Sequence, residues 1–157
     1  DGFKVAMSVL DRGRLHISAV CTGVAERLIS EMTNYAVERK QFGEPIANHQ
    51  LVQAMMADSY AEAYAARCMV LDAAQKRDRG ENVTLLAASC KMFASEMVGR
   101  VADRAVQVFG GAGYIADYGI ERFYRDVRIF RLYEGTTQIQ QIVIGRGLAK
   151  LAKDGQI

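Results

Sequence analysis

Apolar residues recur at helical spacing through the first third of the chain. From about Val9 onward they lie three or four residues apart, at Ile17, Val20, Val24 and Leu28, and the pattern continues to Val37. The segment Phe42-Gly43-Glu44-Pro45 then interrupts it. Pro45 is the only proline in the chain, and proline is tolerated between helices but not inside them. The pattern therefore predicts one long helix that ends before this segment.

Two further apolar stripes follow Pro45. The second stripe consists of Met56, Tyr60, Tyr64, Cys68 and Leu71, and it ends in the polar segment 76–80. The third stripe consists of Leu86, Cys90, Phe93, Met97, Val101 and Val108, and it ends at Gly110. We expect both stripes to pack in the core, since Met and aromatic residues at this spacing are typical of a buried helix face.

The rest of the chain predicts a short helix from Ile120 to Arg131 and a longer one from Thr137 to about Leu151. Thr137 and Gln140 have the spacing of a capping box, which indicates a helix start at Thr137. Long amphipathic helices must bury their apolar faces against one another. The sequence thus predicts a single all-α domain over residues 1–157, an antiparallel four-helix bundle with a short extra helix.

Composition narrows the class of protein. The chain has 157 residues, half of them apolar, and it contains no apolar run near the roughly 20 residues that a membrane span needs. Its 20 basic and 18 acidic residues are interspersed, which argues against a nucleic-acid partner. Cys21, Cys68 and Cys90 are far apart, and we expect all three to be reduced core residues. The first residues, 1–4, include no initiator methionine and no secretion signal, so we expect a piece of a longer protein.

Metal chemistry finds little support in the sequence. Di-iron bundles need a Glu-x-x-His pair on each of two helices, and the chain has none. His16 and His49 are its only histidines, and we interpret them as structural or surface residues. The glycines at 110, 111 and 113 follow a helix instead of opening one after a strand, so they are not a dinucleotide-binding fingerprint.

Two local clusters each allow two interpretations. Arg39 to Gly43 places cations at a helix end, where they favour the helix dipole, but an arginine beside Phe42 also suits a phosphate and a ring. Glu134 lies between Tyr133 and Gly135 just before a helix start. It is either a solvated acid near a positive helix end or a functional carboxylate.

Taken together, these clusters resemble the C-terminal helical domain of the acyl-CoA dehydrogenase family. That domain carries Arg-x-x-Phe-Gly, Gln-x-x-Gly-Gly and Tyr-Glu-Gly-Thr segments, which here are residues 39–43, 107–111 and 133–136. The likeness extends from Asp11 to Arg146 without a large gap.

The resemblance implies a flavoenzyme that converts an acyl-CoA thioester into a trans-2-enoyl-CoA. Glu134 would be the base that removes the α-proton while the β-hydrogen passes as hydride to flavin N5. The FAD-binding residues implied are Arg39, Gln41, Phe42, His49, Gln50, Gln107, Gly110, Gly111, Thr136 and Gln138. The substrate-binding residues implied are Asp11, Arg14, Tyr133 and Gly135. For Asp11 and Arg14 a helix N-terminal salt bridge is an equally good interpretation.

The resemblance also implies partner proteins and two further domains that this chain does not contain. Family members assemble as homodimers or homotetramers, and electron-transfer flavoprotein is the expected electron acceptor. The family's N-terminal helical and middle β domains are absent from this chain, so we expect it to be inactive alone. Two alternatives are a non-catalytic helical interaction module and an acyl-CoA oxidase. Reduced cysteines suit a bacterial cytoplasm or a mitochondrial matrix.

Overall fold

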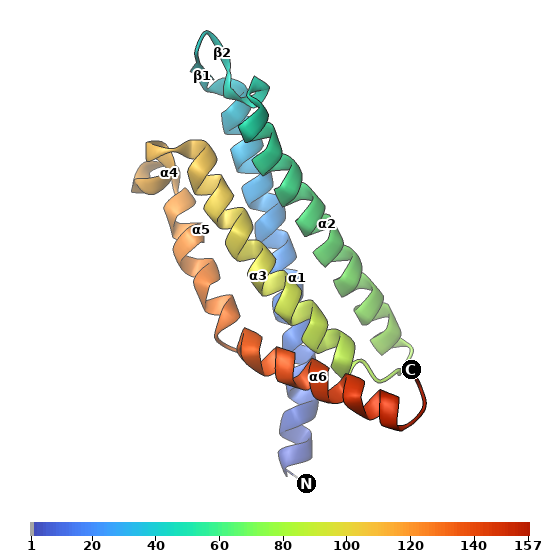
Figure 1. The fold of residues 1–157 in the computed structure, drawn as a ribbon. Coiled ribbons are helices and arrows are strands. Elements are labelled where there is room, and N and C mark those ends of the chain that lie inside the picture. Colours follow the sequence, from blue (N-terminus) through green and yellow to red (C-terminus); the bar gives the residue numbers. More distant parts are fainter. Residues whose placement is uncertain (1) are drawn as a thin grey trace.

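Three long helices form the body of the molecule (Figure 1). The computed structural model describes the backbone of residues 2–157 and the side chains of residue 2 and residues 9–157. Helix α1 (Gly2–Glu38) runs beside α3 (Thr84–Phe109) in the same direction, and α2 (Gln50–Asp78) runs antiparallel to both. The prediction of an all-α fold is confirmed, and α1 begins earlier than the apolar pattern indicated.

A short hairpin connects α1 to α2. Strands β1 (Lys40–Gln41) and β2 (Glu44–Pro45) pair antiparallel, and the 3₁₀ helix η1 (Ile46–Asn48) follows. Phe42 and Gly43 form the tip, with φ angles of 56° and 88°. The turn predicted around Pro45 is therefore a hairpin that projects from one end of the bundle (Figure 1).

The C-terminal third packs on α3. After α4 (Gly111–Tyr114) and η2 (Ala116–Tyr118), α5 (Ile120–Val127) runs back along α3, and η3 (Arg128–Arg131) continues it. Helix α6 (Thr137–Lys153) then crosses α3 near its N-terminal end (Figure 1). The predicted single helix from Ile120 to Arg131 is wrong in its last turn, because the chain tightens to 3₁₀ geometry there, as helix ends often do.

Helix α3 is the centre of the core. Four of the six positions in its predicted stripe are buried, namely Cys90, Met97, Val101 and Val108. Alanines and serines fill much of the remaining buried face, at Ala87, Ala88, Ala94, Ser95, Ala102 and Ala105. Small side chains let neighbouring helices approach closely, so α1, α2, α5 and α6 can all contact this one helix.

The predicted buried face of α2 is wrong. Tyr60 and Tyr64 are 65% and 61% exposed, and Leu71 is also exposed. The residues that α2 buries are Ser59, Ala63, Ala66, Val70 and Ala73. Small residues form the contact because α2 packs closely on α1 and α3, which turns the neighbouring stripe of larger side chains outward. Cys68 lies on that stripe and is exposed, so only Cys21 and Cys90 are core cysteines.

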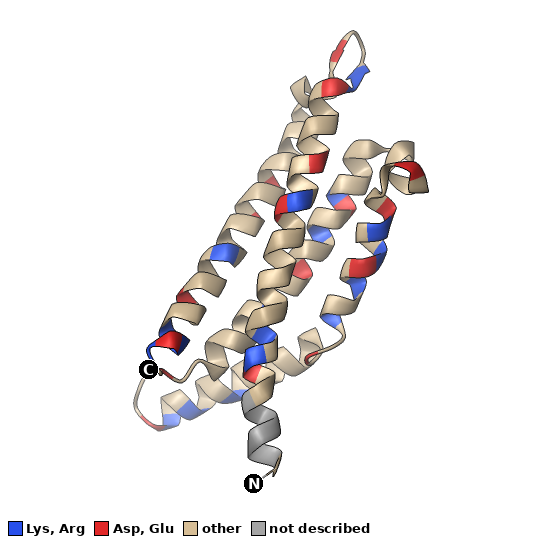
Figure 2. Cartoon of the chain, turned by 180° about the vertical axis from the view of Figure 1, so that it is seen from behind, with Lys and Arg blue, Asp and Glu red and all other residues tan. Residues whose placement is uncertain are grey.

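Charged side chains of both signs are distributed along the helices without forming a basic stripe (Figure 2). Some of them link helices: Glu62 of α2 accepts hydrogen bonds from Arg100 and Arg104 of α3, at 2.8 and 2.9 Å. Within residues 2–157, no helix combines the length and the apolar character that crossing a membrane requires.

Candidate active site around Glu134

Glu134 lies in the loop of residues 132–136, between η3 and α6. Its φ is 56° and that of Gly135 is 90°, so two consecutive residues are left-handed. A left-handed conformation is uncommon for a residue other than glycine. At position 135 a side chain would also collide, because a Cβ there would lie 2.5 Å from Nε2 of Gln140. The Glu-Gly pair therefore gives this loop its sharp turn.

The carboxylate of Glu134 packs against α1 at Gly13. A Cβ at Gly13 would lie 2.8 Å from Cδ of Glu134 and closer still to one carboxylate oxygen. A glycine at this position therefore leaves the space that the acid occupies. The contact joins residues at opposite ends of the sequence.

Asp11 and Arg14 lie on α1 on either side of Gly13. Arg14 is 3% exposed and donates from Nη1 to Oδ1 of Asp11 at 2.9 Å, while its buried Nε has no partner among the described residues. Asp11 also accepts from the Thr84 hydroxyl at 2.6 Å. The ion pair exists, but inside α1 and not at its N-terminus. Asp11 and Arg14 therefore lie at the same end of the bundle as Gly13 and the Glu134 carboxylate.

Two buried polar side chains contact the backbone of the loop. Lys91 of α3 is fully buried, and its Nζ donates to the carbonyl of Gly135 at 2.6 Å. Nε2 of Gln140 donates to the carbonyls of Glu134 and Gly135 at 3.0 and 3.1 Å. Burial is the main cause that lowers the pKa of Lys91 from its ordinary value.

Neither contact follows from the sequence motifs. Gln140 was expected to act as a capping residue, and Lys91 belongs to no motif. A helical-wheel signal for Lys91 does exist, because it shares a face of α3 with Ala94, Ser95 and Val98, all of which are buried. A lysine in line with buried residues indicates a buried, hydrogen-bonded cation.

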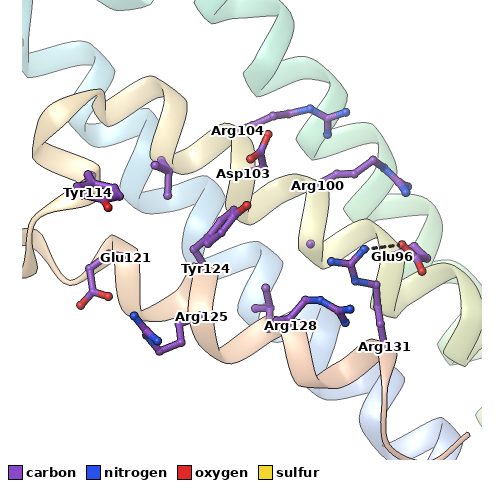
Figure 3. A pocket seen from close by; sticks show the side chains of 14 residues that line it. Glu96, Arg100, Asp103, Arg104, Tyr114, Glu121, Tyr124, Arg125, Arg128 and Arg131 are labelled. Carbon is purple, nitrogen blue, oxygen red and sulfur yellow. Dashed lines mark hydrogen bonds and ion pairs between the residues drawn. The ribbon is translucent and has the colours of Figure 1, made fainter. Parts of the chain in front are cut away.

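The capping prediction at Thr137 is wrong by one residue. Thr136 is the N-cap of α6, and its hydroxyl accepts from the Ile139 N–H at 3.3 Å. The Thr137 hydroxyl instead donates to Oε1 of Glu96 at 2.6 Å. Oε2 of the same Glu96 accepts from Nη1 of Arg131 at 3.3 Å (Figure 3). The loop lies between these two contacts.

Most of the other predicted cofactor residues lie away from Glu134, and only Thr136 and Gln138 lie beside it. Arg39, Gln41 and Phe42 are exposed on the hairpin, with Phe42 93% exposed, and His49 and Gln50 begin α2 beside it. Gln107, Gly110 and Gly111 are exposed at the far end of α3, and Thr136 and Gln138 begin α6. Arg14 lies about 36 Å along the helix from Glu38, the last residue of α1, and Arg39 follows directly. Within one chain, the hairpin residues and those at the far end of α3 therefore do not form one site with Glu134.

A groove elsewhere on the surface is a different feature. A groove of about 1120 Å³ lies between α3 and the α5–η3 segment (Figure 3). Its charged lining consists of Arg100, Arg104, Arg125, Arg128 and Arg131 with Glu96, Asp103 and Glu121. Glu134 does not line this groove, so the groove is not part of the candidate site. Among the side chains that the structure describes, no three His, Cys, Asp or Glu residues are grouped to hold a metal ion.

The chain is a helical-bundle domain that carries an acid, Glu134, in a left-handed loop. Comparison with known proteins gives its family. The family model described as "Acyl-CoA dehydrogenase, C-terminal domain" matches residues 1–149. The chain belongs to the acyl-CoA dehydrogenase family, as its three sequence segments predicted.

Relatives support the same placement. The chain is 45% identical over 149 residues to caffeyl-CoA reductase-Etf complex subunit CarC of Acetobacterium woodii, covering 95% of this chain and 39% of that protein. The structure of butyryl-CoA dehydrogenase from Megasphaera elsdenii has a TM-score of 0.92 and 40% identity, over 94% of this chain and 39% of that one. An FAD complex of PigA has a TM-score of 0.82 and 31% identity, over 84% and 34%. The chain thus spans about two fifths of the relatives that it matches.

Proposed function

We propose that the protein containing this chain uses FAD to dehydrogenate an acyl-CoA thioester to a trans-2-enoyl-CoA, and that Glu134 is its catalytic base. The observation behind this proposal is the position of the Glu134 carboxylate, which lies against Gly13 on a loop whose backbone is held by hydrogen bonds from Lys91 and Gln140. A general base accelerates proton removal only when it is held in reach of the proton. An acidic residue that only keeps the surface soluble would not need to lie at a defined position against another helix.

This chain's residues would act as follows. Glu134 takes the α-proton of the thioester, and Gly135 permits the left-handed turn and the close approach of Gln140 that hold the loop behind it. Tyr133 precedes the base and stacks on Phe130, with ring centroids 6.0 Å apart, which restricts its orientation. Bound flavin supplies the acceptor for the β-hydrogen.

FAD suits the exposed groups at the hairpin and at the end of α3. The Arg39 guanidinium can pair with a pyrophosphate, and the exposed Phe42 ring offers an apolar face. His49 contributes an enclosed Nε2 without a partner among the described residues. A Cβ at Gly110 or Gly111 would meet nothing within 4 Å, so the backbone there is open to a ligand. The FAD complex of PigA, a relative, supports the same cofactor.

The two groups of residues support a shared site in a homodimer or homotetramer. Because about 36 Å of α1 separates Arg14 from the residue before Arg39, we infer that the hairpin of one copy contacts the FAD beside Glu134 of another. We also propose electron-transfer flavoprotein as the acceptor, since the CarC relative belongs to an Etf complex. Because the relatives of this chain are bacterial, we propose that the protein containing it lies in a bacterial cytoplasm.

Reduction of an enoyl-CoA is a second candidate, because the CarC relative is named as a caffeyl-CoA reductase. The same residues would then act in reverse, with protonated Glu134 donating to the α-carbon. The catalytic groups are identical in the two directions. Turnover assays with a reduced and with an oxidised electron partner separate them.

Anaerobic bleaching of the flavin absorbance tests the proposal. The full-length protein is mixed with a panel of acyl-CoA thioesters, and one class is expected to bleach it rapidly. Glu134→Gln should abolish bleaching with FAD still bound, whereas Glu26→Gln, on the exposed surface, should leave it unchanged. Bleaching retained in Glu134→Gln would remove the base role, and a purified protein without flavin would favour the interaction module. Peroxide formed during turnover in air would indicate an oxidase.

A further inference from the structure

Lys91 is the most unusual buried group that the proposed chemistry leaves unused. It is fully buried in α3, and burying an ammonium group is costly unless hydrogen bonds compensate. Among the described residues its hydrogen bond goes to the Gly135 carbonyl, at 2.6 Å. A methionine would fill a similar volume without that cost, so packing does not explain a lysine here. The contact with the loop does.

Glu96 contacts the segments on both sides of the same loop. It lies on α3 and accepts from Arg131, which precedes the loop, and from Thr137, which follows it. Figure 3 shows the ion pair with Arg131. Together, Lys91 and Glu96 connect one rigid helix to the start, the middle and the end of the turn.

The loop needs such contacts because of its backbone. Gly135 adopts its left-handed conformation without strain, but Glu134 does not, and a strained residue of this kind persists only when surrounding structure over-determines it. The direction of the Glu134 side chain depends on that backbone. A relaxed loop would carry the carboxylate away from Gly13.

We propose that Lys91 and Glu96 are positioning residues, which keep the Glu134 loop in its left-handed conformation and so fix the carboxylate for proton removal. This inference rests on the proposed function of Glu134 and adds two residues that touch neither substrate nor cofactor. Because a displacement of about 1 Å can cost on the order of 100-fold in rate, the effect falls on the chemical step and not on substrate binding.

The test uses Lys91→Met in the full-length protein, which removes the donor and keeps a similar volume. FAD content and the affinity for acyl-CoA, read from the spectral change on binding, should stay within about threefold of wild type. The bleaching rate at saturating thioester should fall about 10- to 100-fold. Lys76→Met removes a partly exposed lysine that pairs with Asp72 within α2, and it should change none of these values.

Hydrogen exchange of the peptide covering residues 132–138 is the second readout, taken without substrate. It should be faster in Lys91→Met than in wild type and unchanged in Lys76→Met. If Lys91→Met does not fold, Thr137→Val replaces it, since the valine lacks the hydroxyl that contacts Glu96. That variant should show faster exchange and a smaller loss of bleaching rate, about three- to tenfold.

Wild-type bleaching and exchange in these variants would overturn the inference. A loss confined to thioester affinity would do so as well, because it would indicate a binding role. If no thioester bleaches the wild-type protein, the proposed function fails by itself, and the exchange rates still decide whether Lys91 and Glu96 fix the loop.

Discussion

Gly13 of α1 lies directly against the carboxylate of Glu134. A Cβ at residue 13 would lie 2.8 Å from Cδ and 3.1 Å from Oε1 of the acid. The acid is the far end of a flexible side chain, so it can move aside at little cost to the fold. The size of residue 13 therefore determines where the proposed base lies without deciding whether the domain folds.

Gly13→Ala should lower the rate of flavin bleaching by about tenfold or more through this displacement. Its stability should be equal or higher, because alanine in a helix interior is favoured over glycine by about 0.5–1 kcal/mol. Rapid-mixing absorbance gives the rate, and thermal melting of the full-length protein gives the stability.

Gly23→Ala in the same helix is the matched control. A Cβ at Gly23 would meet nothing within 4 Å, so this variant has the same gain in helix propensity without the contact. It should bleach at the wild-type rate. Equal rates in the Gly13 and Gly23 variants would show that the base does not depend on the contact.

The helices were predictable from the sequence, but the face that α2 buries was not. Apolar periodicity identified the α3 stripe because large residues, such as Met97 and Val101, are buried there. In α2 four of the five buried positions are alanines and a serine, which give a weak hydrophobic signal, while Tyr60 and Tyr64 gave a strong one on the wrong face. Close helix packing selects small residues, and a pattern of large apolar residues does not reveal a face made of small ones.

The candidate site was only partly predictable for a related reason. The local motif around Glu134 gave the acid and its glycine, since both are neighbours in sequence. The contacts with Gly13 and Lys91 join α1, α3 and the loop, and they exist only once these elements pack. The position of the N-cap was missed because two adjacent threonines compete for it, and the contact of Thr137 with Glu96 decides between them.

Thr136→Ala should fray the start of α6, because it removes the hydroxyl that accepts from Ile139. Loss of an N-cap costs about 1 kcal/mol, so hydrogen exchange of the first-turn amides should accelerate roughly fivefold. Thr33→Ala, in the interior of α1, serves as the control and should leave these amides unchanged. Protection retained in Thr136→Ala would show that the hydroxyl does not cap the helix.

Cys21 and Cys90 should resist thiol reagents in the folded protein. Burial raises the pKa of Cys21 to about 12 and that of Cys90 to about 11, so little thiolate forms near neutral pH. Mass spectrometry after brief alkylation should find both unmodified until denaturant is added. Cys68 is exposed in this chain, and Cys68→Ser is the control for surface labelling. Rapid native labelling of Cys21 would contradict the buried environment.

Glu62 should make the stability of the domain depend on pH. Partial burial alone would raise its pKa, but hydrogen bonds from Arg104 and Arg100 outweigh burial and lower the pKa below the ordinary value of 4.5. The folded state therefore binds this proton less readily than the unfolded state, and the stabilisation is present above pH 4.5 and lost as pH falls through the folded value. Denaturant titrations of wild type and Glu62→Gln at several pH values measure this contribution to the free energy of unfolding.

Glu62→Gln should lower the free energy of unfolding by about 1 kcal/mol near neutral pH, and the difference should shrink in acid. Glu26→Gln provides the comparison, because Glu26 pairs with Arg67 at 3.4 Å and both side chains are more than half exposed. Solvent screens such a pair, so its removal should have a smaller effect at every pH. A Glu62→Gln deficit that persists unchanged in acid would mean that packing, and not the ion pairs between α2 and α3, accounts for the loss.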